Sequence, residues 1–193
     1  AGLDRSERGR RRSAVASLRP AVAAQVLLTF DPALREPRDL AGVAVAINDR
    51  TGSHYTALQF LEGPLARHEI NLLHLGSPLS RYRALRAGEV RAAMLMEPHV
   101  SLLLRQGAHQ LGSIFYRGAE VISPELTPEH VAAYTAALDE AVGIINADFP
   151  AAKSFIVEPV RNLLRPEEMF DHFVHYAPSR PMDEARLTSP TSG

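Results

Sequence analysis

The chain has 193 residues, enough for one ordinary domain or two small lobes. Apolar residues make up 46% and charged residues 22%, a balance that supports a packed core and excludes disorder along the whole chain. The formal net charge of -1 argues against a dedicated nucleic-acid-binding protein, which usually carries a strongly basic face. Since there is no cysteine, disulfides, thiolate metal sites and cysteine nucleophiles are excluded.

The N-terminal segment 1–23 is basic, with five arginines in its first twelve residues, and we expect it to be flexible. It could instead be the charged start of an export signal whose apolar part is Ala21–Phe30. Arg19 and Pro20 interrupt that pattern. We favour a buried strand at Ala24–Phe30, a short apolar run rich in branched side chains.

Residues 24–125 alternate short apolar runs with amphipathic segments. The apolar runs predict further strands at Val43–Ile47, Ile70–Leu75, Val90–Met96 and Gln110–Tyr116. The amphipathic segments predict helices at His54–Leu65, Pro78–Ala87 and Val100–Gln106. Gly88 follows the second helix, at the position where a left-handed residue ends a helix with the least strain. Strands that alternate with helices of this length indicate an α/β domain with a mostly parallel sheet flanked by helices.

The C-terminal part, 126–177, is predicted to be helical. Thr127 is a good N-cap for a long helix, Pro128–Ala147, and a shorter helix covers Ala151–Val157. A further helix is expected to start at Pro166. The last residues, 178–193, are rich in proline, serine and threonine, which predicts a flexible tail.

The segment Asn48–Tyr55 follows a predicted buried strand and precedes a predicted helix, a place where parallel sheets bind ligands. The backbone N–H groups of Thr51, Gly52 and Ser53 would lie at the helix N-terminus, where the helix dipole favours an anion. The two hydroxyls would add donors. The same residues also fit a simple turn and N-cap, so the pattern alone leaves both interpretations open.

Three nearby side chains each have two interpretations. His54 either donates to the anion, which would make binding pH-dependent, or lies on the surface of the first helical turn. Tyr55 either borders the ligand or packs with Leu58. Glu97 either accepts a hydrogen bond from a cationic group of the ligand or binds backbone N–H groups at a hinge, and we favour the hinge.

The chain has eight histidines, but only His172 and His175 form a close pair. Asp171 lies beside them, and a zinc site would need a third ligand from elsewhere, so we expect no metal. There is no phosphate-binding glycine loop and no nucleophile elbow, so we expect no cofactor.

Five motifs, in this order, resemble type II periplasmic solute-binding proteins, in particular the branch that binds nitrate, alkanesulfonates, taurine and thiamine precursors. They are Asp39–Val45, Thr51–His54, Leu85–Ala93, Glu97-Pro98, and Thr135–Ala147 with Phe149-Pro150. The resemblance covers about Val26 to Val160. Arg91 stands where the family usually has aspartate, and the part ahead of the first motif is much shorter than a family member's first lobe. We therefore expect a fragment, a degenerate copy or a deliberately shortened form.

The resemblance implies a type II periplasmic-binding-protein lobe at 24–125, with 126–177 belonging to a second, incomplete lobe. It implies the substrate-binding component of an ABC importer, which binds a small anionic organic solute such as a sulfonate, nitrate, a carboxylate or a thiamine-precursor-like molecule. Permease subunits would be its partners and the location would be extracytoplasmic. No convincing signal peptide is present, so a cytoplasmic location stays open. The expected ligand-binding residues are Asn48, Thr51, Gly52, Ser53, His54, Tyr55, Glu97 and Tyr116.

An enzyme on the same fold is the alternative, and relatives with this architecture include decarboxylases, desulfinases, dehydratases and pyrimidine-synthesis enzymes. His54 and Glu97, together with Tyr116, would then be the acid–base groups, and they would have to share a pocket and have perturbed pKa values.

The long helix Pro128–Ala147 also predicts self-association. Its apolar face has little chain upstream to cover it, and so large an exposed apolar stripe is unusual in monomers. The face consists of Val131, Tyr134, Leu138, Val142 and Ile145. We expect a homodimer in which two chains bury these faces against each other.

Overall fold

The computed structural model describes residues 14–123 and 125–181, which divide into two compact units. The described part of unit 1 is 14–22, 117–123, 125–147 and 176–181. Unit 2 is Ala23–Tyr116 with Asp148–His175. This division corrects the predicted boundaries at 24–125 and 126–177, because strands β1 (Ala14–Thr29) and β5 (His109–Ile122) each run through both units.

The sheet has the strand order β3-β2-β4-β1-β5, with β3 at Asn71–His74, β2 at Ala44–Ile47 and β4 at Ala92–Leu95. Strand β2 is parallel to both β3 and β4, while β1 is antiparallel to β4, with Val26 opposite Leu95. Two short strands, β6 (Val174–Tyr176) and β7 (Arg180–Pro181), also pair with β1. The mixed α/β fold is therefore as predicted, although one central strand runs against the parallel ones.

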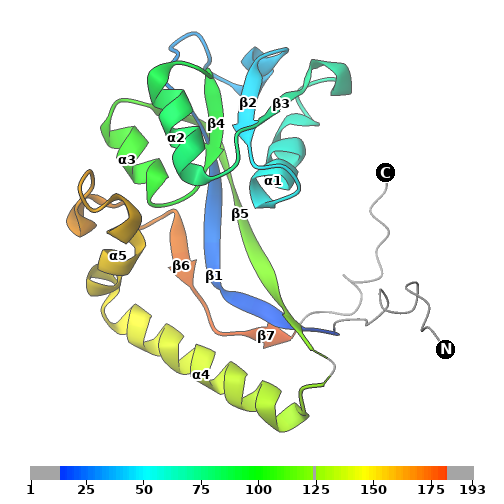
Figure 1. Cartoon of the computed structure of the whole chain (residues 1–193), viewed down its shortest axis with the longest axis vertical. Helices are drawn as coiled ribbons and strands as arrows, with labels where there is room; N and C mark the ends of the chain where they lie inside the picture. The colour runs from blue at the N-terminus through cyan, green and yellow to red at the C-terminus, as the bar shows by residue number, and fades with distance from the viewer. Residues whose placement is uncertain (1–13, 124, 182–193) are drawn as a thin grey trace, which may run out of the picture. The chain divides into compact units, whose positions relative to one another are not determined.

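Helices cover both faces of the unit 2 sheet (Figure 1). Helix α1 (Gly52–Leu61) packs on one face, and α2 (Pro78–Ala87) and α3 (His99–Arg105) pack on the other, while α5 (Phe149–Val157) follows later in the chain. The α1 side holds a cluster of buried residues that includes Leu27, Val45, Ile47, Ala57, Leu61 and Met94. This core explains why the strands read as continuous apolar runs, since residues on both faces are covered.

Strand β1 begins at Ala14, ten residues before the predicted start, so the prediction of a flexible segment is wrong for 14–23. Ser17 and Leu18 pair with β7, and the carbonyl of Pro20 accepts a hydrogen bond from the Ala177 amide. Proline has no N–H to donate, but it can accept such a bond, which makes it tolerable in this strand. Arg180–Pro181 likewise belong to β7 rather than to a flexible tail; residues 1–13 and 182–193 lie outside the described residues.

Two predicted helices are shorter in the structure. Helix α1 ends at Leu61 rather than Leu65, because Gly63 and Pro64 follow and a residue before proline disfavours helical geometry. The segment that starts at Pro166 forms only a 3-10 turn, Pro166–Glu168. Three more 3-10 turns occupy Pro37–Leu40, Arg67–Glu69 and Glu158–Val160.

Helix α4 (Pro128–Ala147) has the apolar face that the sequence predicts, and unit 1 covers that face in part. Val142 is buried, whereas Tyr134 is 48% exposed. A hollow of about 370 Å³ lies along this face, bordered by the Pro20 end of β1 and by Tyr176. From the sequence we expected little chain to cover the apolar face of α4. In the structure, the part of β1 that precedes the predicted strand borders this face.

Gly88 adopts the left-handed conformation predicted for it, with φ of +73°, and its amide donates to the carbonyls of Ala84 and Leu85. A Gly88→Ala substitution should lower the free energy of unfolding by about 1 kcal/mol, since a side chain at positive φ is strained. Gly63→Ala is the matched control, because a Cβ there meets nothing within 4 Å and its φ is not left-handed. Urea unfolding of both variants tests this, and equal stabilities would contradict it.

Candidate functional site

The loop that follows β2 and the first turn of α1 form the centre of the site. Thr51 is the N-cap residue of α1 in an extended conformation. Its hydroxyl donates to the Asn48 carbonyl at 2.8 Å, and the buried Ser53 Oγ accepts from the Asn48 amide at 2.9 Å. These two hydroxyls therefore bind backbone groups of their own loop. The resemblance had led us to expect that they would donate to a ligand. The donors left at the helix N-terminus are the amides of Gly52 and Ser53, which have no carbonyl one turn earlier to bind.

Tyr116, the last of the predicted ligand-binding residues in chain order, lies against the first turn of α1. A Cβ built on Gly52 would be 3.5 Å from Cζ and 3.6 Å from the hydroxyl oxygen of Tyr116. The absence of a side chain at Gly52 is thus what allows the phenol to approach the α1 backbone. Both residues belong to unit 2, and the phenol hydroxyl lies beside Gly52 at the start of α1. The unpaired amides at a helix N-terminus and a phenol O–H are both donors from which an anion can accept hydrogen bonds.

His54 faces the loop that precedes it. Its Nδ1 is 3.0 Å from the Arg50 amide, from which it can accept, and 2.7 Å from Asp49 Oδ1, to which it can donate when Nδ1 carries a hydrogen. One nitrogen cannot do both at once, so the position of the ring hydrogen decides which bond forms. Arg50 has a φ of +57°, a strained conformation for a residue with a side chain, and the bond to His54 supports it.

The sequence analysis missed His74 as part of this loop. Its Nδ1 accepts a hydrogen bond from the Asp49 amide at 2.9 Å. A signal was present: His74 ends β3, which is parallel to β2 with Ile47 opposite His74, and the carboxyl ends of parallel strands meet at one edge.

Two other predicted site residues, Tyr55 and Glu97, do not form part of the centre of the site. Tyr55 is 62% exposed and stacks on the His54 ring at 5.5 Å, so the alternative in which it packs with Leu58 is wrong. Glu97 accepts hydrogen bonds from the amide and hydroxyl of Ser101, at 3.1 Å and 2.6 Å, and so caps α3. Burial raises the pKa of Glu97, and these two bonds oppose that shift. The geometry of Glu97 agrees with backbone capping rather than with a ligand contact.

Among residues 14–123 and 125–181, no three His, Cys, Asp or Glu side chains are placed to hold a metal ion. His172 packs against Phe170 and Phe173, and Asp171 forms an ion pair with Lys153. In the same part of the chain, no helix has the length and apolar character needed to cross a membrane.

A Ser53→Ala substitution tests how much the loop depends on its hydroxyl. The Asn48 amide would lose its acceptor beneath α1, and we expect the free energy of unfolding to fall by about 1 kcal/mol. Ser80→Ala in the exposed first turn of α2 is a control for the general effect of removing a hydroxyl near a helix start. Urea unfolding provides the measurement, and a Ser53→Ala variant as stable as the parent would refute the role of this bond.

Several solved structures resemble this chain. The alkanesulfonate-binding protein SsuA from Xanthomonas axonopodis pv. citri, bound to MOPS, matches with a TM-score of 0.67 at 20% identity, over 90% of this chain and 63% of that one. The periplasmic aliphatic sulphonate binding protein SsuA from Escherichia coli matches with a TM-score of 0.65 at 19% identity, over 89% of this chain and 64% of that one. The fold is that of a type II periplasmic binding protein.

The chain spans just under two thirds of the length of these two SsuA proteins. The desulfurization enzyme DSZB shares the type II fold as well, with a TM-score of 0.63 at 15% identity over 93% of this chain and 70% of that one. No family model matches the chain, and no curated protein sequence matches it. The family resemblance seen in the motifs is therefore confirmed at the level of fold.

Proposed function

We propose that this chain is the solute-binding part of an ABC importer and that it captures a small organic anion at the first turn of α1. The observation that carries the proposal is the close approach of the Tyr116 phenol to Gly52, the first residue of α1. A helix N-terminus favours negative charge, and the phenol adds a directed donor. The fold likeness to two sulfonate-binding proteins supports a sulfonate as the ligand. Nitrate, a carboxylate or a thiamine-precursor-like molecule rests on the motif resemblance alone.

The remaining predicted residues take supporting roles in this proposal. Asn48, Thr51 and His54 hold the loop in shape, and Tyr55 borders the site through its stacking on His54. Permease subunits of the importer would be the partners, and the protein would act outside the cytoplasm.

Isothermal titration calorimetry with methanesulfonate, taurine, nitrate and acetate tests this proposal. We expect at least one anion to release or absorb heat, and Tyr116→Phe to weaken its binding by about fivefold through loss of one hydrogen bond. Tyr134→Phe, a substitution of the same kind on α4, should leave binding unchanged. If none of the anions binds, or if Tyr116→Phe binds as tightly as the parent, the site is not at α1.

The enzymatic alternative rests on the fold likeness to DSZB, and its test uses the same samples. Proton NMR of each anion after prolonged incubation would show any conversion. We expect none, because Glu97 is occupied as the cap of α3 and His54 is occupied within the loop. Product formation that disappears in Glu97→Gln would establish the enzyme instead.

Self-association remains part of the proposal. In unit 1 Val142 is buried, whereas Tyr134 and Ile144 are largely exposed. One helix on a narrow sheet leaves apolar surface that a second copy could cover. Light scattering should give a mass near twice 21.1 kDa, and Leu138→Glu on the apolar face should restore the monomer. A monomer of the parent chain at high micromolar concentration would exclude the dimer.

A further inference from the structure

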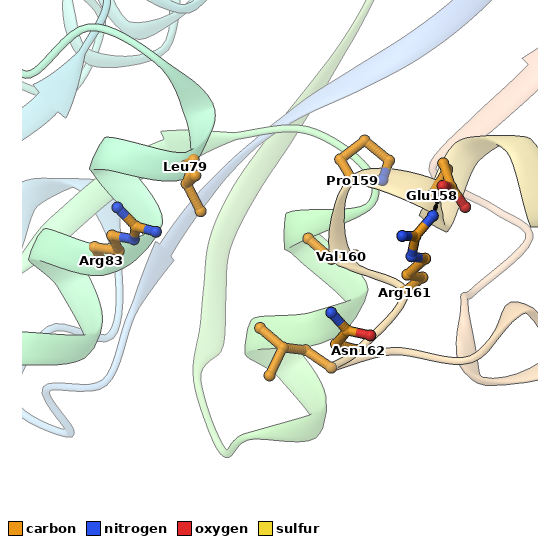
Figure 2. Close-up of a pocket in the computed structure, with 8 residues that line it drawn as sticks. Leu79, Arg83, Glu158, Pro159, Val160, Arg161 and Asn162 are labelled. Atoms are coloured by element: carbon orange, nitrogen blue, oxygen red, sulfur yellow. Dashed lines mark hydrogen bonds and ion pairs between the residues drawn. The ribbon is translucent and has the colours of Figure 1, made fainter.

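A hollow of about 550 Å³ lies within unit 2, on the side of the sheet that α2 covers. Leu79 and Arg83 extend from α2 on one side of it, and the turn that begins at Glu158 forms the other side (Figure 2). The volume is in the range that small-molecule sites occupy. Because α1 covers the opposite face of the sheet, this hollow is separate from the candidate anion site.

The walls of the hollow are apolar and in part open. Val160 is buried at 4% exposure, whereas Leu79 is 39% and Leu163 is 58% exposed. Leu79 from α2 and Val160 from the turn after α5 approach the same space from two directions (Figure 2), and Leu163 also lines it. Apolar surface gathered in a concave place binds the apolar part of a ligand more readily than the same residues scattered over the surface.

One positive charge beside this apolar surface has no counter-charge. Glu158 forms an ion pair with Arg161, so that pair is neutral as a whole. No carboxylate of the described residues forms an ion pair with Arg83, and α2 itself contains no acidic residue. A ligand that places one negative charge at Arg83 would therefore neutralise the unpaired positive charge beside the hollow.

We propose that this hollow binds an amphiphilic monoanion, a medium-length alkyl or acyl chain that ends in one carboxylate, sulfonate or sulfate. The chain lies against Leu79, Val160 and Leu163. The anionic group accepts hydrogen bonds from the Arg83 guanidinium, whose planar donors fit such oxygen pairs. The site goes beyond the proposed capture of solute at α1, since it uses none of the same residues and selects for an apolar tail.

Octanoate below its micellar concentration is the probe, and backbone amide NMR is the readout. We expect octanoate to shift the resonances of Leu79, Arg83 and the segment 158–163. Acetate lacks the tail and octyltrimethylammonium has the opposite charge, so neither should shift them. Arg83→Gln should weaken octanoate binding by about fivefold, and Arg83→Lys, which keeps the charge but not the planar donors, should restore only part of it. Leu163→Asn, at an exposed position that is not required for folding, should also weaken it.

The outcomes separate this site from the site at α1. Shifts confined to Gly52, Ser53 and Tyr116 would place octanoate at α1 and overturn the second site. Equal shifts with the cationic amphiphile, or unchanged affinity in Arg83→Gln, would also overturn it. Failure of methanesulfonate to bind, with octanoate still bound at Arg83, would remove the proposed function and leave this site standing. Cosedimentation with phosphatidylcholine vesicles that contain oleate distinguishes a membrane-borne carboxylate from one free in solution.

Discussion

Acidification from pH 6.5 to pH 4 should remove about 3 kcal/mol of folding stability through one side chain, His99. Burial, followed by the nearby Arg81 charge, lowers the pKa of His99 from 6.5 to about 4. His99 is 6% exposed, its ring lies 5.7 Å from that of Tyr82, and neither ring nitrogen has a hydrogen-bond partner among the described residues. The folded protein thus holds the imidazole neutral in surroundings that cannot stabilise its charge.

The sign of the effect follows from comparing the two states. Above pH 6.5 the imidazole is neutral in both the folded and the unfolded chain, so it does not affect stability. Between 6.5 and 4 only the unfolded chain takes up the proton, and unfolding is favoured progressively. Asp31 and Asp39 have pKa values lowered by their hydrogen bonds, so their effects appear only at more acidic pH.

Urea unfolding at pH 7.5 and pH 4.5 measures this. His99→Leu should lose much less stability than the parent chain over that interval, because it has no imidazole to protonate in the unfolded state. His68→Gln, a substitution of an exposed histidine, should keep the full loss. Parallel losses in the parent and in His99→Leu would assign the acid sensitivity to other groups.

Gly112→Ala should destabilise the protein by about 2 kcal/mol through overpacking. A Cβ at Gly112 in β5 would overlap the Cζ and Cε2 atoms of Phe60 and lie 3.2 Å from its Cε1. The Phe60 ring packs against the buried cluster under α1, so it cannot move away without disturbing that core. The new methyl group must therefore displace either the ring or the strand.

A double-mutant cycle separates this overlap from a general effect of alanine in a strand. Phe60→Leu removes the ring edge, so Gly112→Ala should cost much less in that background than in the parent. Gly143→Ala in α4 is a contrasting control: a Cβ there meets nothing within 4 Å, and alanine favours helix, so stability should rise slightly. Additive effects of the Gly112 and Phe60 substitutions would show that the predicted overlap is absent.

The elements whose signals are local could be predicted from the sequence alone. Helix α2 spans Pro78–Ala87 as predicted; the Ser77 hydroxyl accepts from the Ser80 amide at its start, and Gly88 ends it. Helix α4 likewise begins at Pro128 and ends at Ala147. Such signals involve residues that lie within one or two helical turns of each other, so both interacting residues can be recognised in a short stretch of sequence. The ordered motifs similarly pointed to the type II fold, which the comparison with solved structures confirms.

Features that depend on residues far apart in the chain could not be predicted from the sequence. The first residues of β1 follow a run of arginines and were predicted to be flexible, but Ser17 and Leu18 pair with β7 near the other end of the chain. The meeting of Tyr116 with Gly52, and of His74 with Asp49, follows from strand order and register, which no short motif encodes. The hydroxyls of Thr51 and Ser53 were expected to face a ligand. In the structure they form hydrogen bonds with the carbonyl and the amide of Asn48, because backbone groups turned away from water need partners within the protein.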